Sequence, residues 1–292
     1  MIRIYSLSIL FLFFVSSCIA QSEHKSIHQL QSDHYSRYNF GSEKKWDALR
    51  ISENGVSPEL KKNESIQACT LNKRVFGWNP YWAGSAYNNY QWNLLSDLCH
   101  FSYEVIAASG QATSTHSWAT DAAVTAAKNN GVKIHLCATL FSSHATFLTS
   151  STAMNTFITN IISLLNQRGA NGVNIDFEGV PSAQSANFTA FMINLCNQVH
   201  AANASYEVSI ALPAVDWSAV YNVNAMKNYV DLFIIMGYDY YYGGSTTAGP
   251  SDPLYNYETS YNYTLTKSIT YYLNKSVPNN KLLLGLPYYG EE

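Results

Sequence analysis

Charged residues are scarce in this chain: Asp, Glu, Lys and Arg make up 13% of its 292 residues, and the formal net charge is only -3. A protein that binds nucleic acid presents a basic surface, and one that binds an ionic polymer presents a strongly charged face. This composition offers neither feature, so it argues against nucleic acid as a partner. A neutral substrate suits the chain better.

Cysteine pairs at metal-ligand or redox spacing are also missing. The five cysteines include no Cys-x-x-Cys pair, and no histidine stands near them at ligand spacing. Cys137 and Cys196 lie within apolar periodic segments, so we expect buried free thiols at both positions. The sequence therefore predicts neither a metal nor a cofactor.

The apolar run near the N-terminus is too short to span a membrane. Residues 1–20 contain Arg3, an apolar run at 7–15 and small residues after it, which is the layout of a secretory signal peptide. Cleavage after Ala20 is one possibility; the other is a bacterial lipobox, which the Val-Ser-Ser-Cys sequence ending at Cys18 resembles. We expect a secreted or envelope-anchored protein, whose one link to a membrane would be a lipid on Cys18.

Residues 21–72 lack a sustained apolar face and are rich in Lys, Ser, Glu and His. We interpret this segment as a polar linker or a loosely docked leader. His24, His28 and His34 could suggest a metal site, but their spacing is irregular and no carboxylate or cysteine completes a ligand set. A solvated tail is the favoured interpretation of these histidines.

Aromatic residues, in contrast, are abundant, at 14% of the chain with 22 Tyr and 6 Trp. Flat rings stack on sugar rings, so this content fits carbohydrate binding, although core packing explains it equally well. The hydrophobic content of 47% is enough for the core of one large α/β domain.

From residue 73 the sequence alternates between short apolar segments and amphipathic ones. Seven strands are predicted, at 74–78, 98–106, 132–141, 172–178, 206–213, 230–240 and 281–287. Helices are predicted at 152–168, where Gly169 supplies the stop, around 188–199 and at 261–274. Because each strand is separated from the next by room for a helix, this order indicates a parallel sheet.

A parallel sheet of seven or eight such units is most simply a (β/α)8 TIM-type barrel, whose active site lies at the C-terminal ends of the strands. A doubly wound open sheet is the alternative. No G-x-G-x-x-G or G-x-x-x-x-G-K-[ST] motif follows any strand, so the usual features of nucleotide-binding open sheets are missing. The predicted fold class is α/β, a barrel at residues 73–292 with only seven strands.

Two acids alternate along the predicted strand at 172–178. Side chains alternate between the faces of a strand, so the polar residues Asn174, Asp176 and Glu178 would face the barrel interior and the apolar ones the helices. Glu178 lies at the mouth and Asp176 roughly 6 to 7 Å deeper. The charge of Asp176 would raise the pKa of Glu178 and keep a proton available for general acid catalysis. A hydrogen-bonded polar ladder is the structural alternative, but burying an unused carboxylate pair is costly.

These residues resemble the fourth-strand signature of the family-18 glycoside hydrolases, Asp-Gly-x-Asp-x-Asp-x-Glu, which here is NGVNIDFE at 171–178. Three further segments match in the same order: GWNPYW at 77–82, MGYD at 236–239 and GLPYYG at 285–290. The resemblance covers about residues 73–290 and implies hydrolysis of β-1,4-linked N-acetylglucosamine polymers, with chitin as the first candidate substrate. NIDFEGVP and MGYDYY look nearer to a branch that cleaves peptidoglycan-type chains, so both substrate classes stay open.

The resemblance also implies residue roles in a substrate-assisted mechanism, an exception to the scheme of two catalytic carboxylates. Glu178 would protonate the glycosidic oxygen while the N-acetyl oxygen of the sugar attacks the anomeric carbon and forms an oxazolinium ion. Asp176 would orient the acetamido group, and Tyr238 and Asp239 would hold it. Three residues would line the subsite, with ordinary packing an equal alternative for each: Trp78, Tyr103 and Met236.

The sequence departs from the family pattern in three places. Asn174 stands where the family usually has Asp, CATLFSS at 137–143 replaces a Ser-x-Gly-Gly turn, and no eighth strand with its Trp follows residue 290. We therefore expect either a piece of a longer protein or an inactive remnant; an inactive glycan-binding protein is a further alternative, against which Glu178 argues. Since a missing strand exposes two sheet edges, residues 21–292 alone should be largely insoluble, unless a segment of 21–72 fills the eighth position.

Overall fold

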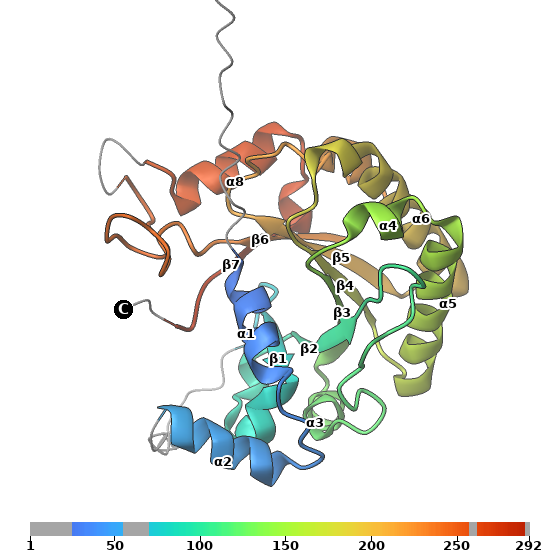
Figure 1. Ribbon diagram of the computed structural model, residues 1–292, viewed down its shortest axis with the longest axis vertical. Helices are drawn as coiled ribbons and strands as arrows, with labels where there is room; N and C mark the ends of the chain where they lie inside the picture. Colours follow the sequence, from blue (N-terminus) through green and yellow to red (C-terminus); the bar gives the residue numbers. More distant parts are fainter. Residues whose placement is uncertain (1–24, 55–69, 257–261, 290–292) are drawn as a thin grey trace, which may run out of the picture.

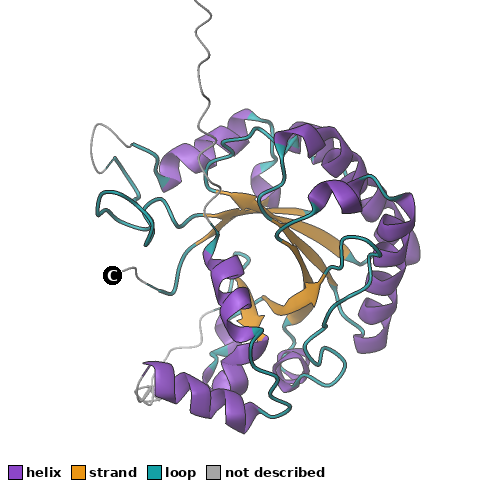
Figure 2. Ribbon diagram, viewed as in Figure 1, coloured by secondary structure: helices purple, strands orange, loops and turns teal. Residues whose placement is uncertain are grey.

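The computed structural model describes residues 25–54, 70–256 and 262–289. Its strands form one curled, parallel sheet with helices around its outer face (Figures 1 and 2). The strands are β1 (Phe76–Pro80), β2 (Asp97–Glu104), β3 (Lys133–Leu140), β4 (Gly172–Phe177), β5 (Glu207–Pro213), β6 (Leu232–Met236) and β7 (Leu282–Gly285). All seven predicted strands are confirmed. The predicted signal peptide, Cys18 and Cys69 lie outside the described residues.

The strand order separates the two predicted architectures. Each strand pairs in parallel with the one before it, in the order β1-β2-β3-β4-β5-β6-β7. A doubly wound sheet would reverse direction at a switch point, whereas a barrel adds its strands in sequence around one axis. The fold is therefore a (β/α)8-type barrel, to which the described residues contribute seven strands, as predicted. The described part of residues 21–72 forms helices and does not fill the eighth position with a strand.

The long helices follow the predicted periodicity. The helices are α1 (Ile27–Tyr35), α2 (Glu43–Asn54), α3 (Ala122–Asn129), α4 (His144–Leu148), α5 (Ser151–Arg168), α6 (Ser185–Ala202), α7 (Val223–Met226) and α8 (Leu265–Asn274). Gly169 ends α5 with a φ of 57°, a left-handed conformation that suits glycine, as the sequence predicted. None of these helices is both long enough and apolar enough to cross a membrane.

The two faces of β4 have opposite character, as the alternation predicts. Val173, Ile175 and Phe177 are buried in the main hydrophobic core between the sheet and its helices. On the inner face, Asn174 donates its Nδ2 hydrogen to Ser209 Oγ at 2.9 Å and accepts from Trp78 Nε1 at 3.3 Å. These hydrogen-bonded polar side chains lie further from the C-terminal end of β4 than Asp176 and Glu178 do. Cys137 and Cys196 are buried free thiols, which confirms that prediction.

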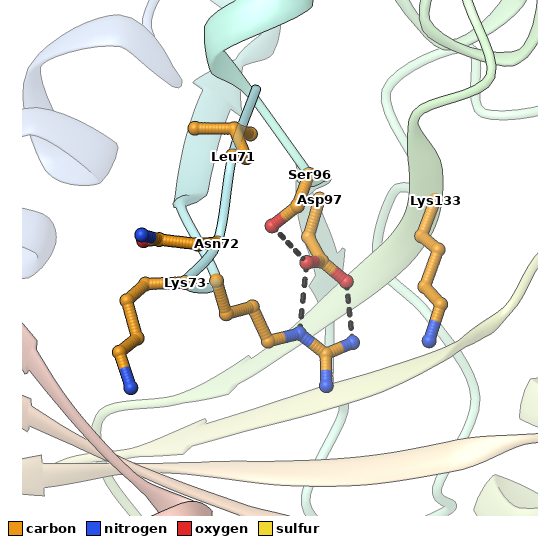
Figure 3. A pocket seen from close by; sticks show the side chains of 7 residues that line it. Leu71, Asn72, Lys73, Ser96, Asp97 and Lys133 are labelled. Carbon is orange, nitrogen blue, oxygen red and sulfur yellow. Dashed lines mark hydrogen bonds and ion pairs between the residues drawn. The ribbon is translucent and has the colours of Figure 1, made fainter. Parts of the chain in front are cut away.

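A network of ion pairs closes the opposite, N-terminal end of the barrel. Arg74 donates to both carboxylate oxygens of Asp97, from Nε at 2.8 Å and from Nη2 at 2.6 Å. Figure 3 shows Asp97 at this end of the barrel, together with Ser96 and Lys133. The Nη2 atom of Arg74 also pairs with Glu207, and His135 Nε2 lies 2.8 Å from Asp97 Oδ1. Burial would raise the pKa of Asp97, but hydrogen bonds from Arg74 and His135 lower it well below its ordinary value. The network joins the segment before β1 to β2, β3 and β5.

We predict that Arg74→Ala lowers the free energy of unfolding by about 3 kcal/mol, because it leaves the buried Asp97 carboxylate without its main cation. Lys133→Ala is the matched control, since Lys133 donates to Glu207 at 2.6 Å from a side chain that is 46% exposed. An exposed pair contributes less than about 1 kcal/mol. Urea unfolding followed by circular dichroism measures both changes. Equal losses in the two variants would show that Arg74 is not the main partner of Asp97.

Candidate active site

Two acidic side chains meet at the C-terminal end of β4. Asp176 lies within the strand and its side chain is fully buried, while Glu178 directly follows the strand with its side chain 12% exposed. The backbone N–H of Glu178 donates to Leu140 O at 3.1 Å, so the end of β3 fixes the position of Glu178. The predicted arrangement, with Glu178 at the mouth and Asp176 deeper, is confirmed.

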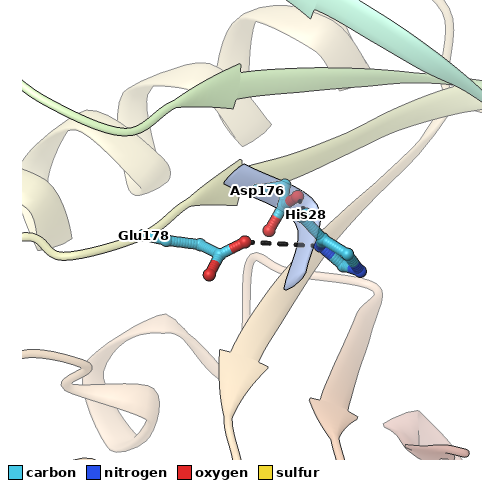
Figure 4. Close-up of side chains that lie close together, drawn as sticks. All are labelled: His28, Asp176 and Glu178. Atoms are coloured by element: carbon cyan, nitrogen blue, oxygen red, sulfur yellow. Dashed lines mark hydrogen bonds and ion pairs between the residues drawn. The ribbon is translucent and has the colours of Figure 1, made fainter. Parts of the chain in front are cut away.

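A histidine from the N-terminal segment completes this cluster (Figure 4). The Nδ1 atom of His28 in α1 lies 3.1 Å from Asp176 Oδ2 and 3.3 Å from Glu178 Oε1. Its Nε2 atom lies 3.0 Å from the hydroxyl oxygen of Tyr238. The interpretation of His28 as part of a solvated tail is therefore wrong, because its side chain is only 18% exposed and lies within 3.3 Å of three site residues.

Little in the sequence could have revealed the position of His28. The contact with Asp176 spans 148 residues of chain, and the polar composition around His28 gives no periodic signal. The local structure is better encoded: Ser26 caps α1 by accepting a hydrogen bond from Gln29 N at 3.1 Å. A capped helix was thus predictable, but its docking site was not.

The environment sets the protonation of the cluster. The pKa of Glu178 is raised to about 7: burial is the largest cause, the charge of Asp176 adds to it, and hydrogen bonds from His28 and Ser26 oppose it. Burial acts to lower the pKa of His28, but Asp176 and Glu178 outweigh this effect and raise it well above its ordinary value. The charge of Asp176 thus acts in the predicted direction, second to burial. Glu178 is therefore able to hold a proton near neutral pH.

Tyr238 and Asp239, which follow β6, join the acids as expected. Burial is the main cause that raises the pKa of Tyr238 well above its ordinary value, and Asp176 and Glu178 raise it further, so its hydroxyl stays protonated. Asp239 has a φ of 58°, in the left-handed region. Its Oδ1 accepts from the Tyr289 hydroxyl at 2.7 Å, and its Oδ2 from the backbone N–H of Ile27 at 3.4 Å. Both residues thus contact the N-terminal segment.

The three predicted lining residues lie in different places. Trp78 is inside the barrel, bonded to Asn174 below the acids, and Met236 is the partly buried last residue of β6. Tyr103 instead packs in the outer core, where its hydroxyl donates to Gly110 O at 2.7 Å and its ring meets Phe157. The structure therefore gives Tyr103 the packing role and not the lining role.

A bulge in β2 explains the position of Tyr103. The register of β2 against β3 shifts between His100 and Tyr103, and this shift turns Tyr103 toward the helices. Phe101, two residues earlier, faces the site instead, with its ring centroid 5.8 Å from that of His28. Sequence reasoning missed Phe101 because simple alternation does not reveal a bulge.

Two clusters in the described residues have the composition of a metal site. One is His28, Asp176 and Glu178; the other is Asp97, His135 and Glu207, and within each the ligand atoms lie within 4.8 Å of one another. In the second cluster, Arg74 and Lys133 bond directly to the carboxylates, so ion pairing within the chain accounts for it. In the first cluster, His28 is itself one of the three possible ligands.

The fold and site together define a class. A parallel barrel with two carboxyl groups at the C-terminal end of β4, one of them with a raised pKa, has the architecture in which barrel enzymes place acid–base groups. The sequence profile described as "Glycosyl hydrolases family 18" matches residues 75–292. The chain belongs to this family of glycosyl hydrolases, which confirms the resemblance noted in the sequence.

Known relatives agree with this assignment. The chain is 31% identical to the putative sporulation-specific glycosylase YdhD of Bacillus subtilis (strain 168), over 49% of this chain and 32% of the relative. It is 29% identical to chitotriosidase-1 of Mus musculus, over 48% of this chain and 34% of the relative. The matches thus span about a third of these curated relatives.

Solved structures show the same fold. Catalytic domain 2 of the Ostrinia furnacalis group II chitinase superposes with a TM-score of 0.65 at 20% identity, over 74% of this chain and 64% of the other. The solved structure of the Bacillus subtilis glycosylase gives a TM-score of 0.56 at 27% identity, over 65% of this chain and 62% of that chain. The seven-stranded sheet is therefore that of a family-18 barrel.

We predict that the pKa of Glu178 falls when the neighbouring carboxylate is removed. Asp176→Asn should lower the pKa of Glu178, because the adjacent negative charge disappears. In the unmodified protein the carboxyl group should hold its proton below about pH 7 and lose it as the pH rises further. Carbon-13 NMR of the Glu178 carboxyl group, assigned with Glu178→Gln, measures this. An unchanged value in Asp176→Asn would mean that burial alone raises the pKa.

Proposed function

We propose that this protein hydrolyses β-1,4-linked N-acetylglucosamine polymers, chitin or its oligomers, by substrate-assisted catalysis with retention of configuration. The observation that best supports this is the convergence of Glu178, Asp176 and Tyr238 on one space, which the His28 ring occupies. Glu178, with its pKa raised to about 7, can supply a proton there, while the buried Asp176 can stabilise a positive charge.

The proposed reaction has two steps. In the first, Glu178 gives its proton to the glycosidic oxygen, the bond from that oxygen to the anomeric carbon breaks, and the acetamido oxygen of the sugar bonds to that carbon. Asp176 orients the acetamido N–H and stabilises the oxazolinium ion, and Tyr238 and Asp239 hold the same group. In the second, water attacks the anomeric carbon, the bond from that carbon to the acetamido oxygen breaks and restores the acetamido group, and the water gives a proton back to Glu178. Two successive displacements at one carbon retain its configuration.

A cell-wall glycan of the peptidoglycan type is the second candidate substrate. The 31% identity to a sporulation-specific glycosylase favours it, since no other relative described above is as similar in sequence. The same mechanism applies wherever the reacting sugar bears an N-acetyl group. Relative rates on chitotetraose and on purified peptidoglycan decide between the two, and binding without turnover of either would indicate an inactive glycan-binding protein.

Secretion or anchoring in the cell envelope is part of this proposal, because either substrate lies outside the cytoplasm. It depends on residues 1–20 and on the lipobox-like sequence that ends at Cys18. Mass spectrometry of the mature N-terminus would distinguish cleavage after Ala20 from lipid attachment at Cys18. An intact Met1 would contradict both.

We predict that Glu178→Gln lowers the rate of chitotetraose hydrolysis by about a hundredfold or more, because the amide has the shape of the acid but no acidic proton. Binding of chitotetraose, measured by calorimetry, should be largely retained. Asn174→Asp is a matched control on the same face of β4, since it restores the residue usual in the family and keeps the acid. More than a tenth of the activity remaining in Glu178→Gln would remove Glu178 from the acid role.

We predict that sugars without an N-acetyl group are not cut, because the proposed nucleophile belongs to the substrate. Cellotetraose and fully deacetylated chitosan should release no reducing ends, and a thiazoline analogue of the intermediate should inhibit competitively. The measurement is a reducing-end assay with chitotetraose as the reference. Similar rates on cellotetraose and chitotetraose would contradict the mechanism and favour a hydrolase with two catalytic carboxylates.

A further inference from the structure

The N-terminal segment occupies the space that the proposed reaction needs. The contacts of His28 with Asp176, Glu178 and Tyr238 are all between 3.0 and 3.3 Å, so no sugar ring fits between these groups while His28 is in place. The backbone N–H of Ile27 lies 3.4 Å from Oδ2 of Asp239, which is the third residue assigned to the acetamido group besides Asp176 and Tyr238. One turn of helix thus contacts every proposed acetamido-binding residue.

A second contact resembles the stacking of a sugar on an aromatic ring. Tyr35, at the end of α1, lies against Trp82 with ring centroids 4.6 Å apart and planes inclined by 17°. Trp82 belongs to η1 (Tyr81–Asn89), which directly follows β1. His28 and Tyr35 are seven residues apart, roughly 10 Å along a helix axis. The segment therefore covers both the acidic site and a neighbouring aromatic face.

The next helix anchors this segment to the barrel. Trp46 of α2 is buried, with its ring centroid 5.5 Å from that of Tyr81. Asp47 of α2 accepts a hydrogen bond from Ser85 N at 2.9 Å. Gly84 permits this approach: its φ is 57°, and a Cβ atom there would lie 2.4 Å from Asp47 Oδ1. Shape and hydrogen bonding both indicate a specific docking site.

We propose that residues 25–54 form an inhibitory segment that competes with the glycan for the active-site groove, with His28 in the place of the acetamido group and Tyr35 on the face of Trp82. The charges are complementary, because the imidazole lies between two carboxyl groups. The inference rests on the proposed function, since it takes the groove to bind a glycan. Displacement of α1 is then a condition for activity. If only a small fraction of the protein has an open groove, the apparent affinity for the glycan is reduced by that fraction.

Calorimetric binding of chitotetraose to the full-length protein tests the competition. His28→Ala and Tyr35→Ala should each tighten binding by about tenfold or more, because each weakens the docked state. Lys25→Ala is the control: Lys25 belongs to the same segment, but its side chain is 54% exposed and pairs with the exposed Asp33 at 2.6 Å. Its affinity should equal that of the unmodified protein. Equal affinities in all four proteins, or weaker binding in His28→Ala, would overturn the proposal.

Hydrogen exchange provides a readout that does not depend on catalysis. Backbone amides of α1 should be protected in the unmodified protein and in Lys25→Ala, and should exchange faster in His28→Ala or when chitotetraose is added. Chitotetraose binding with no change in α1 exchange would overturn the competition. Failure of every variant to bind chitotetraose would overturn the proposed function instead. In that case, loss of α1 protection in His28→Ala would still show that His28 holds α1 in the groove.

Discussion

Asp176 and Glu178 lie close together at the end of one buried strand, so ionising both carboxyl groups is costly unless a cation lies beside them. The protonation of Glu178 and the position of His28 both depend on this electrostatic constraint. Burial and the charge of Asp176 raise the pKa of Glu178 to about 7, so Glu178 keeps a proton near neutral pH. His28 Nδ1 lies 3.1 Å from Asp176 Oδ2 and 3.3 Å from Glu178 Oε1, and the two acids raise the pKa of His28 well above its ordinary value in spite of burial. The same electrostatic situation that favours a general acid also attracts a cation into the groove.

The pKa values of buried acids are shifted in opposite directions at the two ends of the barrel. At the N-terminal end, Arg74 bonds to both oxygens of Asp97, and the pKa of Asp97 falls well below its ordinary value in spite of burial. At the C-terminal end, the environment of Glu178 raises its pKa. Paired acids of the first kind stabilise a fold, and acids of the second kind can exchange protons. This division agrees with the usual separation of stability and activity in parallel barrels.

The position of His28 depends on how the N-terminal segment docks on the barrel. Aromatic contacts of Tyr35 and Trp46 with η1 position α1, and α1 in turn places His28 between the acids. An intramolecular ligand acts at a high effective concentration, so modest contacts are enough to keep the groove filled. Regulation would then depend on whatever displaces the segment, and not on a change in the barrel itself.

The sequence by itself determined the strand and helix order, the inward position of Asp176 and Glu178, and the direction in which one acid shifts the pKa of the other. These features depend on the local periodicity of apolar residues and on the spacing of two acids within one strand. Both can be read directly from the order of residues in the sequence. Only the tertiary structure decided the positions of His28 and Tyr103. His28 reaches an acid 148 residues away, and Tyr103 follows a bulge in β2. Long-range docking and register shifts depend on how surfaces pack together in the folded protein. The local alternation of polar and apolar residues does not predict that packing.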